Sequence, residues 1–189
     1  MTVLVSNYLK FKSSRAQLLL GFLLFLISCA SERSQYTISG NTMGTSYSVK
    51  LVSINSGINI QSIEDGIDSI LVSINKQMST WDPTSDISKF NSLTSIEPLS
   101  ISDDLVHVID NSINISKKTN GLFDITVYDL MRIWGFGPNP MSSFPKNDDI
   151  EQVLKITGYE NINITNKKIS KNNIKVKLDL NAIAKGFGV

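Results

Sequence analysis

The stretch that decides the fold is IKVKLDLNAIAKGFG, residues 174–188. Its first half alternates apolar and polar side chains, which predicts a strand with one buried face and with Asp179 on the polar face. We expect this strand to form a hairpin with Lys167–Ser170 through a Lys-Asn-Asn turn. After Asp179 come small residues and then Lys185. This order lets backbone and side chains close around an anionic ligand or a metal ion.

The rest of the chain mixes strand and helix patterns without a regular βαβ rhythm. Strands are expected at Tyr36–Ser39 and Thr45–Ile54, separated by a loop at residues 40–44 whose two glycines allow it to bend around a ligand. Apolar residues at helical spacing and capping residues predict helices over 60–76, from Ser85 or Asp86 to Asn91, from Ser102 to just before Asn120, and from Asn147 to just before Gly158. The pattern predicts an α+β fold of mixed helices and a largely antiparallel sheet.

Residues 1–28 have the composition of an export signal. A basic start precedes a short apolar run, which ends in Leu-Ile-Ser-Cys at residues 26–29 and resembles a bacterial lipobox. We expect Cys29 to be acylated and to become the mature N-terminus; an ordinary buried cysteine in a signal anchor is the alternative. Residues 29–36 would then be a tether and residues 37–189 the folded domain. The expected location is the bacterial periplasm, anchored to a membrane through Cys29, with the inner membrane favoured over the outer.

Composition excludes several classes of protein. Cys29 is the only cysteine, so no intramolecular disulfide can form. The chain has 18 basic and 17 acidic residues, with no dominant basic patch, so nucleic acid is not expected as a partner. The single histidine, His107, lies off the apolar stripe of its helix and has no nearby metal-binding or nucleophilic group. Neither a Ser-His-Asp triad nor a zinc site is therefore expected.

Four segments carry residues that a hydrophobic core does not require. They are residues 40–47 (GNTMGTSY), residues 78–91 (MSTWDPTSDISKFN), residues 121–138 (GLFDITVYDLMRIWGFGP) and residues 179–188 (DLNAIAKGFG). In this order, and behind a lipobox, they resemble the FAD:protein FMN transferases of the ApbE family. The resemblance covers residues 39–189, which correspond to the N-terminal half or somewhat more of the family domain.

The resemblance implies a single ApbE-like domain that is truncated at its C-terminus. It also implies magnesium-dependent transfer of FMN from FAD to a threonine or serine of an exported acceptor protein, such as a subunit of a redox-driven membrane pump. The implied FAD-binding residues are Met43, Trp81, Leu122, Phe123, Asp124, Asp179 and Lys185. The implied Mg²⁺ ligand is the backbone carbonyl of Ala182. Apolar and aromatic walls suit flat rings, and a lysine suits a pyrophosphate.

Structural alternatives remain open for several of these residues. Met43 could fill the core, Trp81 could cover its edge, Asp124 could cap the turn after Gly121, and Lys185 could be solvated. Asn181 stands where the family commonly has glycine, and asparagine tolerates the same backbone turn. Because the family's further magnesium ligands come from a later segment, we expect little transferase activity from these 189 residues alone.

Three other functions remain open at this stage. The same scaffold could hydrolyse FAD as a pyrophosphatase, or bind FAD as a lipoprotein without chemistry. A purely structural lipoprotein is the third alternative. The sequence does not identify the acceptor or the oligomeric state.

Overall fold

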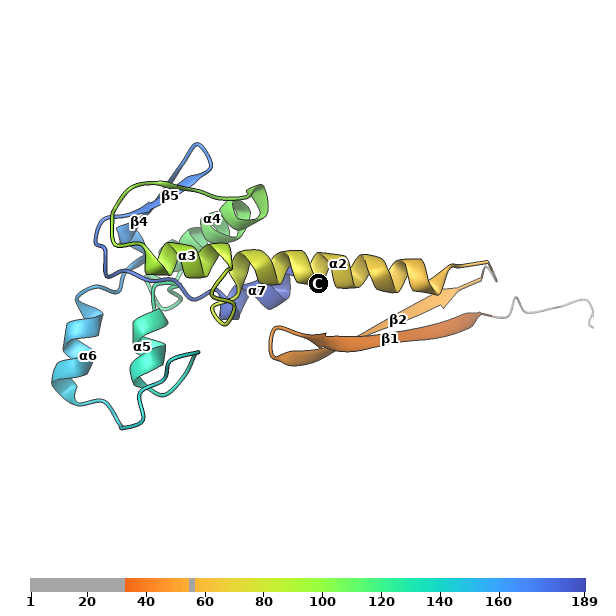
Figure 1. The fold of residues 1–189 in the computed structure, drawn as a ribbon, viewed down its shortest axis with the longest axis horizontal. Helices are drawn as coiled ribbons and strands as arrows, with labels where there is room; N and C mark the ends of the chain where they lie inside the picture. Colours follow the sequence, from red (N-terminus) through yellow and green to blue (C-terminus); the bar gives the residue numbers. More distant parts are fainter. Residues whose placement is uncertain (1–32, 55–56) are drawn as a thin grey trace, which may run out of the picture. The chain divides into compact units, whose positions relative to one another are not determined.

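A computed structural model describes residues 33–54 and 57–189 (Figure 1). The expected export signal and the expected acylation site Cys29 lie outside the described residues. The structure describes residues 33–36 of the expected tether, and residues 34–36 already belong to a strand that begins at Ser34. By its internal contacts the chain divides into two compact units. The described residues of the first are 33–38, 49–54 and 57–58, and the second comprises residues 39–48 and 59–189.

The elements follow one another in a mixed order. They are β1 (Ser34–Thr42), β2 (Thr45–Ser53), α2 (Ile60–Met78), α3 (Asp86–Ser92), β3 (Leu99–Ser100), α4 (Asp103–Lys118), α5 (Tyr128–Ile133), α6 (Asn147–Leu154), the 3₁₀ turn η1 (Tyr159–Asn161), β4 (Ile162–Thr165), β5 (Lys168–Lys171) and α7 (Asn181–Phe187). β1 and β2 form a two-stranded sheet, and the other strands form a three-stranded antiparallel sheet in the order β3-β5-β4. This confirms the α+β class.

Helix starts agree with the capping residues in the sequence. The side chain of Asn59 accepts a hydrogen bond from the N–H of Ser62 at the start of α2. Ser85 caps α3 and Ser102 caps α4 in the same way, each through its hydroxyl. These bonds satisfy N–H groups that have no partner within the helix. The predicted helices over 60–76 and from Ser102 to before Asn120 are confirmed.

The predicted hairpin between residues 167–170 and 174–180 is wrong. The hairpin joins β4 to β5, with Ile164 opposite Ile169 in the register. Its two turn residues, Asn166 and Lys167, both have positive φ, which is the geometry of a tight hairpin turn. Residues 176–180 have no regular secondary structure and belong to no strand. The alternating pattern therefore reflects burial on one side of the segment and not pairing in a sheet.

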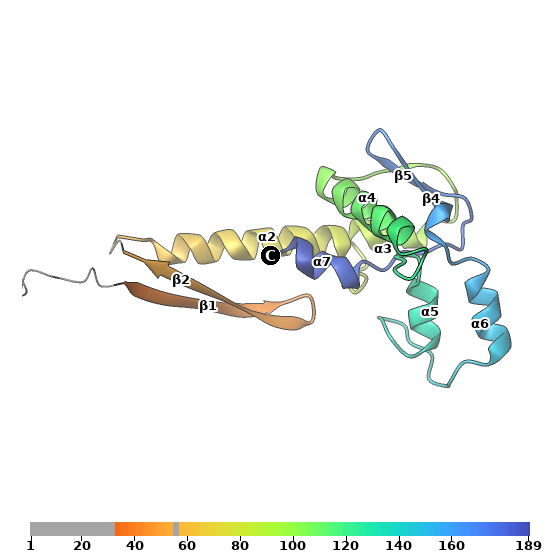
Figure 2. The same ribbon diagram turned by 180° about the vertical axis from the view of Figure 1, so that it is seen from behind.

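The core of the second unit collects residues from almost every element of that unit. Its largest fully buried side chains include Phe90, Ile87, Leu105, Ile109, Ile125, Ile169, Leu178 and Leu180. The terminal helix α7 contacts α2 and α4 and lies beside the C-terminal half of α2 in both views (Figures 1 and 2). Residues 176–180 therefore run through the core, and α7 returns the chain to the surface of α2. Among the described residues, no helix combines the length and the apolar character that crossing a bilayer requires.

Candidate functional site

The β1–β2 turn presents Met43 at the edge of a cavity. The predicted loop at residues 40–44 is shorter than expected, because β1 continues to Thr42 and only Met43 and Gly44 form the turn. Both have positive φ, 50° and 69°. A left-handed conformation is unfavourable for methionine, so its side chain is held there by the surroundings. Met43 packs, partly buried, against the core.

Two hydrogen bonds fix this turn to α2. The Tyr47 hydroxyl donates to Asp68 Oδ1 at 2.7 Å, and Asn75 Nδ2 donates to Thr42 Oγ1 at 3.0 Å. The bond to Asp68 raises the pKa of Tyr47. Gly40 makes room for the tyrosine: a Cβ at this position would lie 2.7 Å from its ring. Glycine at position 40 is thus explained by packing and not by a bend around a ligand.

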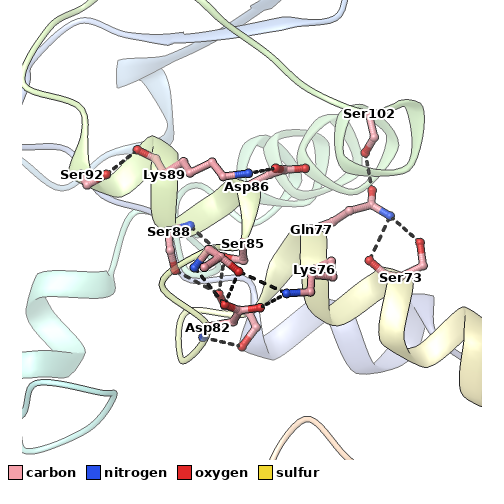
Figure 3. A network of polar contacts seen from close by, with 12 residues as sticks. Ser73, Lys76, Gln77, Asp82, Ser85, Asp86, Ser88, Lys89, Ser92 and Ser102 are labelled. Atoms are coloured by element: carbon pink, nitrogen blue, oxygen red, sulfur yellow. Dashed lines mark hydrogen bonds and ion pairs between the residues drawn. The ribbon is translucent and has the colours of Figure 1, made fainter.

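The turn that carries Trp81 is held by a dense polar network (Figure 3). The carbonyl of Ser79 accepts hydrogen bonds from the hydroxyls of Ser85, at 2.6 Å, and Ser88, at 3.1 Å. At the end of α2, Gln77 is bonded to Ser73 and also accepts a bond from the Ser102 hydroxyl. The turn is therefore fixed by several hydrogen bonds, although Trp81 itself is 65% exposed.

A carboxylate completes this network. Asp82 accepts two hydrogen bonds from Thr84, one from the N–H and one from the hydroxyl, and pairs with Lys76 Nζ at 3.1 Å. The bonds from Thr84, followed by the bond from Lys76, lower the pKa of Asp82 to about 2. The carboxylate is consequently ionised at every physiological pH.

Residues 178 and 179 are anchored by two distant segments. The Asn91 side chain pairs with both backbone groups of Leu178, donating to its carbonyl at 2.8 Å and accepting from its N–H at 2.7 Å. The next N–H, of Asp179, donates to the carbonyl of Ile125 at 2.8 Å. All four segments singled out in the sequence therefore converge around the start of α7.

Three of the expected flavin-binding residues line one cavity. It has a volume of about 360 Å³, within the range of ligand pockets. Its lining includes Met43, Trp81 and Lys185, together with Ile74, Met78 and Ala184. Among the residues that the structure describes, no ion pair involves Lys185. Its ammonium group is therefore available to an anion. A flat ring can lie on the apolar walls while an attached phosphate reaches the lysine.

The structure keeps the remaining flavin-binding candidates outside this lining. Leu122 is 93% exposed and Phe123 packs partly against the core. Asp124 Oδ1 accepts bonds from the N–H and hydroxyl of Thr126, and its Oδ2 accepts from the N–H of Tyr159 at 2.8 Å. These bonds tie the segment after α4 to the start of η1.

Asp179 and Ala182 lie at the start of α7. Asp179 is 9% exposed, so its expected place on a polar strand face is wrong. Its two oxygens accept from the backbone N–H and the side-chain amide of Asn181, at 2.8 and 3.0 Å. Both carboxylate oxygens are thus engaged by Asn181, the first residue of α7. In the described part of the chain no three His, Cys, Asp or Glu residues form a metal-binding group. One carbonyl and one engaged carboxylate do not make the six-ligand shell of Mg²⁺.

Sequence reasoning missed other residues at this site. Asn181 and Ala184 line the first cavity because residues 181–187 form a helix, where a ligand-binding turn was expected. The alternating pattern places Lys177 on the same polar face of the expected strand as Asp179, yet it lines a second cavity together with Trp81. A charged residue inside an apolar alternating run was the signal that could have found it.

These observations define a class: an α+β protein with a largely apolar pocket that carries one lysine. The family model described as "ApbE family" matches residues 43–189, and the chain belongs to the ApbE family. It is similar to the FAD:protein FMN transferase of Vibrio cholerae, with 35% identity over 171 residues, covering 90% of this chain and 51% of that protein. The corresponding protein of Haemophilus influenzae is 35% identical over 173 residues, covering 88% and 50%.

Solved structures show the same fold. "Flavin Transferase ApbE from Vibrio cholerae" superposes with a TM-score of 0.80 at 35% identity, covering 84% of this chain and 52% of that one. The apo flavinyl transferase ApbE of Pseudomonas stutzeri gives 0.78 at 29% identity, covering 84% and 53%. The chain spans about half the length of the curated relatives it matches.

Proposed function

We propose that the intact protein transfers FMN from FAD to a threonine or serine hydroxyl of an exported acceptor protein. The observation that carries this proposal is the shared cavity of Met43, Trp81 and Lys185. In the reaction, the acceptor oxygen forms a bond to the phosphorus on the riboflavin side of FAD. The bond from that phosphorus to the AMP portion breaks, AMP leaves, and the hydroxyl proton passes to solvent.

The residues of the chain bind and orient FAD in this proposal. Met43 and Trp81 form the walls for a ring system, and Lys185 neutralises pyrophosphate charge. Leu122, Phe123 and Asp124 lie next to Ile125, which is bonded to Asp179. A longer ligand that leaves the cavity along the segment before α7 would reach them.

Magnesium is part of the same proposal, with the Ala182 carbonyl as one ligand. The ion would neutralise phosphate charge as the bond breaks. Because the described residues offer too few oxygen donors, phosphate oxygens, water and ligands from elsewhere must complete its shell.

The test is an FMN-transfer assay with a matched pair of lysine variants. The intact protein is incubated with FAD and a threonine-containing acceptor, and the acceptor is examined by mass spectrometry for one added FMN. Lys185→Gln should weaken FAD binding at least tenfold, whereas Lys168→Gln, an exposed lysine on β5, should not. Release of FMN and AMP without acceptor modification would indicate a pyrophosphatase. FAD retention without any product would indicate a binding protein.

The proposed location is the periplasm, with Cys29 as the lipid anchor. The sequence Leu-Ile-Ser-Cys after a short apolar run supports it. Fatty-acid labelling of the protein in cells should be lost in Cys29→Ser. Labelling that persists in this variant would refute the anchor.

A further inference from the structure

Lys171, the last residue of β5, is a buried lysine without a counter-ion. It is 2% exposed, and in the parts of the chain that the structure describes no ion pair involves it. Burial lowers the pKa of its ammonium group, and the charge of Lys177 lowers it further. A buried cation without a counter-ion destabilises a folded protein unless hydrogen bonds replace its water.

Two backbone carbonyls from different segments accept hydrogen bonds from the Lys171 ammonium. Its Nζ donates to the carbonyl of Phe90 at 3.3 Å and to the carbonyl of Val176 at 3.2 Å. Phe90 lies in the last turn of α3, where the carbonyl groups form the negative end of the helix dipole. The Nζ also lies 5.0 Å from the centre of the Phe90 ring, within the range of a cation–π interaction. One side chain of β5 therefore joins α3 to the segment before α7.

The bond to Val176 is the first of three anchors on the segment that leads into α7. The second is the pair of hydrogen bonds between the Asn91 side chain and the backbone of Leu178. The third joins the N–H of Asp179 to the carbonyl of Ile125 at 2.8 Å. Val176 and Leu178 are fully buried, so water cannot replace a partner that is lost there. The backbone over residues 176–179 is thus held by three partners before α7 begins.

The anchored segment determines where α7 carries Lys185. α7 begins two residues after Asp179, and its first turn includes a bond from the N–H of Ala184 to the carbonyl of Leu180 at 2.8 Å. The helix therefore continues directly from the anchored backbone, and a displacement of that backbone moves the helix with it. Lys185 lines the first cavity, where a displacement of about 1 Å is enough to weaken a contact with a ligand.

We propose that Lys171 is a positioning residue for the flavin site: its buried ammonium fixes residues 176–180 and thereby the place from which α7 presents Lys185 to the first cavity. Lys171 acts through Lys185 and does not itself touch the ligand. This inference rests on the proposed function, in which Lys185 binds the pyrophosphate of FAD. An apolar side chain would avoid the cost of burying a charge, so the backbone arrangement that the ammonium enforces explains the lysine better than stability does.

The first test compares Tm and FAD affinity in variants of the intact protein. Lys171→Met loses the hydrogen bonds but also the buried charge, so Tm should change by less than about 3 °C, while FAD binding weakens about five- to tenfold. Lys171→Arg keeps a cation with N–H donors but is larger, so it should lower Tm more than Lys171→Met and weaken FAD binding less. The matched control is Lys168→Met, an exposed lysine of the same strand, which should change neither. Losses of affinity that simply follow the losses of Tm would overturn the proposal.

The second test asks whether Lys171 acts through Lys185. In the Lys185→Gln background the additional change Lys171→Met should alter FAD affinity by less than about twofold, because the group that it positions is already absent. A merely structural role would weaken FAD binding by the same factor in both backgrounds. Equal factors would therefore refute the role of Lys171 as a positioning residue.

Hydrogen–deuterium exchange of the ligand-free protein separates this inference from the proposed function. Lys171→Met should speed exchange of the amides of Leu178, Asp179 and Ala184 about tenfold or more, and leave the amides of α4 unchanged. Unchanged exchange at these three amides, or the same acceleration in α4, would overturn the inference. Failure of the wild type to bind FAD would refute the proposed function, while the exchange rates would still decide whether Lys171 fixes the entry into α7.

Discussion

The side chain of Asn91 occupies the place that a neighbouring strand would have at Leu178. Its amide donates to the Leu178 carbonyl at 2.8 Å and accepts from the Leu178 N–H at 2.7 Å. Leu178 is fully buried, so no water can replace these bonds. One side chain at the end of α3 therefore holds the strand-like segment that leads into α7 and Lys185.

Asn91→Ala should lower the free energy of unfolding by about 2–5 kcal/mol, because it leaves two buried backbone groups without partners. Chemical denaturation measures this loss. Asn163→Ala removes an exposed amide that is bonded to Asn172 and should cost less than about 0.5 kcal/mol. Equal losses in the two variants would mean that the pair with Leu178 contributes little.

Changes at Met43 should move stability and ligand binding in opposite directions. Asparagine accepts positive φ more readily than methionine, so Met43→Asn should stabilise the protein by about 0.5–1 kcal/mol. It also removes an apolar wall of the first cavity and should weaken FAD binding. Met43→Leu should keep the binding without the gain in stability. Thermal unfolding and an FAD titration test both effects, and tighter FAD binding by Met43→Asn would refute this role of the side chain.

The stabilising effect of Asp82 should disappear in acid. Its folded-state pKa of about 2 lies below the ordinary value of 3.8, so the unfolded chain binds a proton first as the pH falls. The stability it contributes is complete above about pH 4 and is lost as the pH falls through about 2. The difference in Tm between wild type and Asp82→Asn should therefore shrink across this window. A constant difference from pH 6 to pH 2 would contradict the assignment.

Asp124 is expected to act mainly through stability. Asp124→Asn puts an amide N–H group against either the N–H of Tyr159 or the donors of Thr126, and should cost about 2–4 kcal/mol. Asp110→Asn, on the exposed face of α4, should cost less than about 0.5 kcal/mol. Unfolding curves and FAD affinity are both required. A stable Asp124→Asn variant that no longer binds FAD would show that the carboxylate is free for the ligand.

Local chemistry made much of the fold predictable. The caps Asn59, Ser85 and Ser102 and the apolar spacing of α2 and α4 act within a few residues, and each appears in the sequence where the structure has it. The prediction of a strand at 174–180 was wrong because an alternating pattern indicates burial on one face. It does not show which group forms hydrogen bonds with the backbone of the segment. Here that partner is partly a side chain 87 residues away, which no local pattern can show.

The site was predictable by residue type more than by geometry. The resemblance brought Met43, Trp81 and Lys185 together, and the structure places them around one cavity. The apolar–polar alternation assigned Asp179 to a polar face, but an asparagine two residues later satisfies both its oxygens and allows its burial.

Trp81 belongs to the lining of two cavities, so its indole cannot adapt to a guest in one without altering the other. Any shift of the ring that tightens one site changes the affinity of the second, and thermodynamic linkage requires the effect to be equal in both directions. A rigid turn beneath an exposed ring favours a response by rotation of the side chain alone. A ligand bound in either cavity would thus act on the other through the rotamer of a single residue.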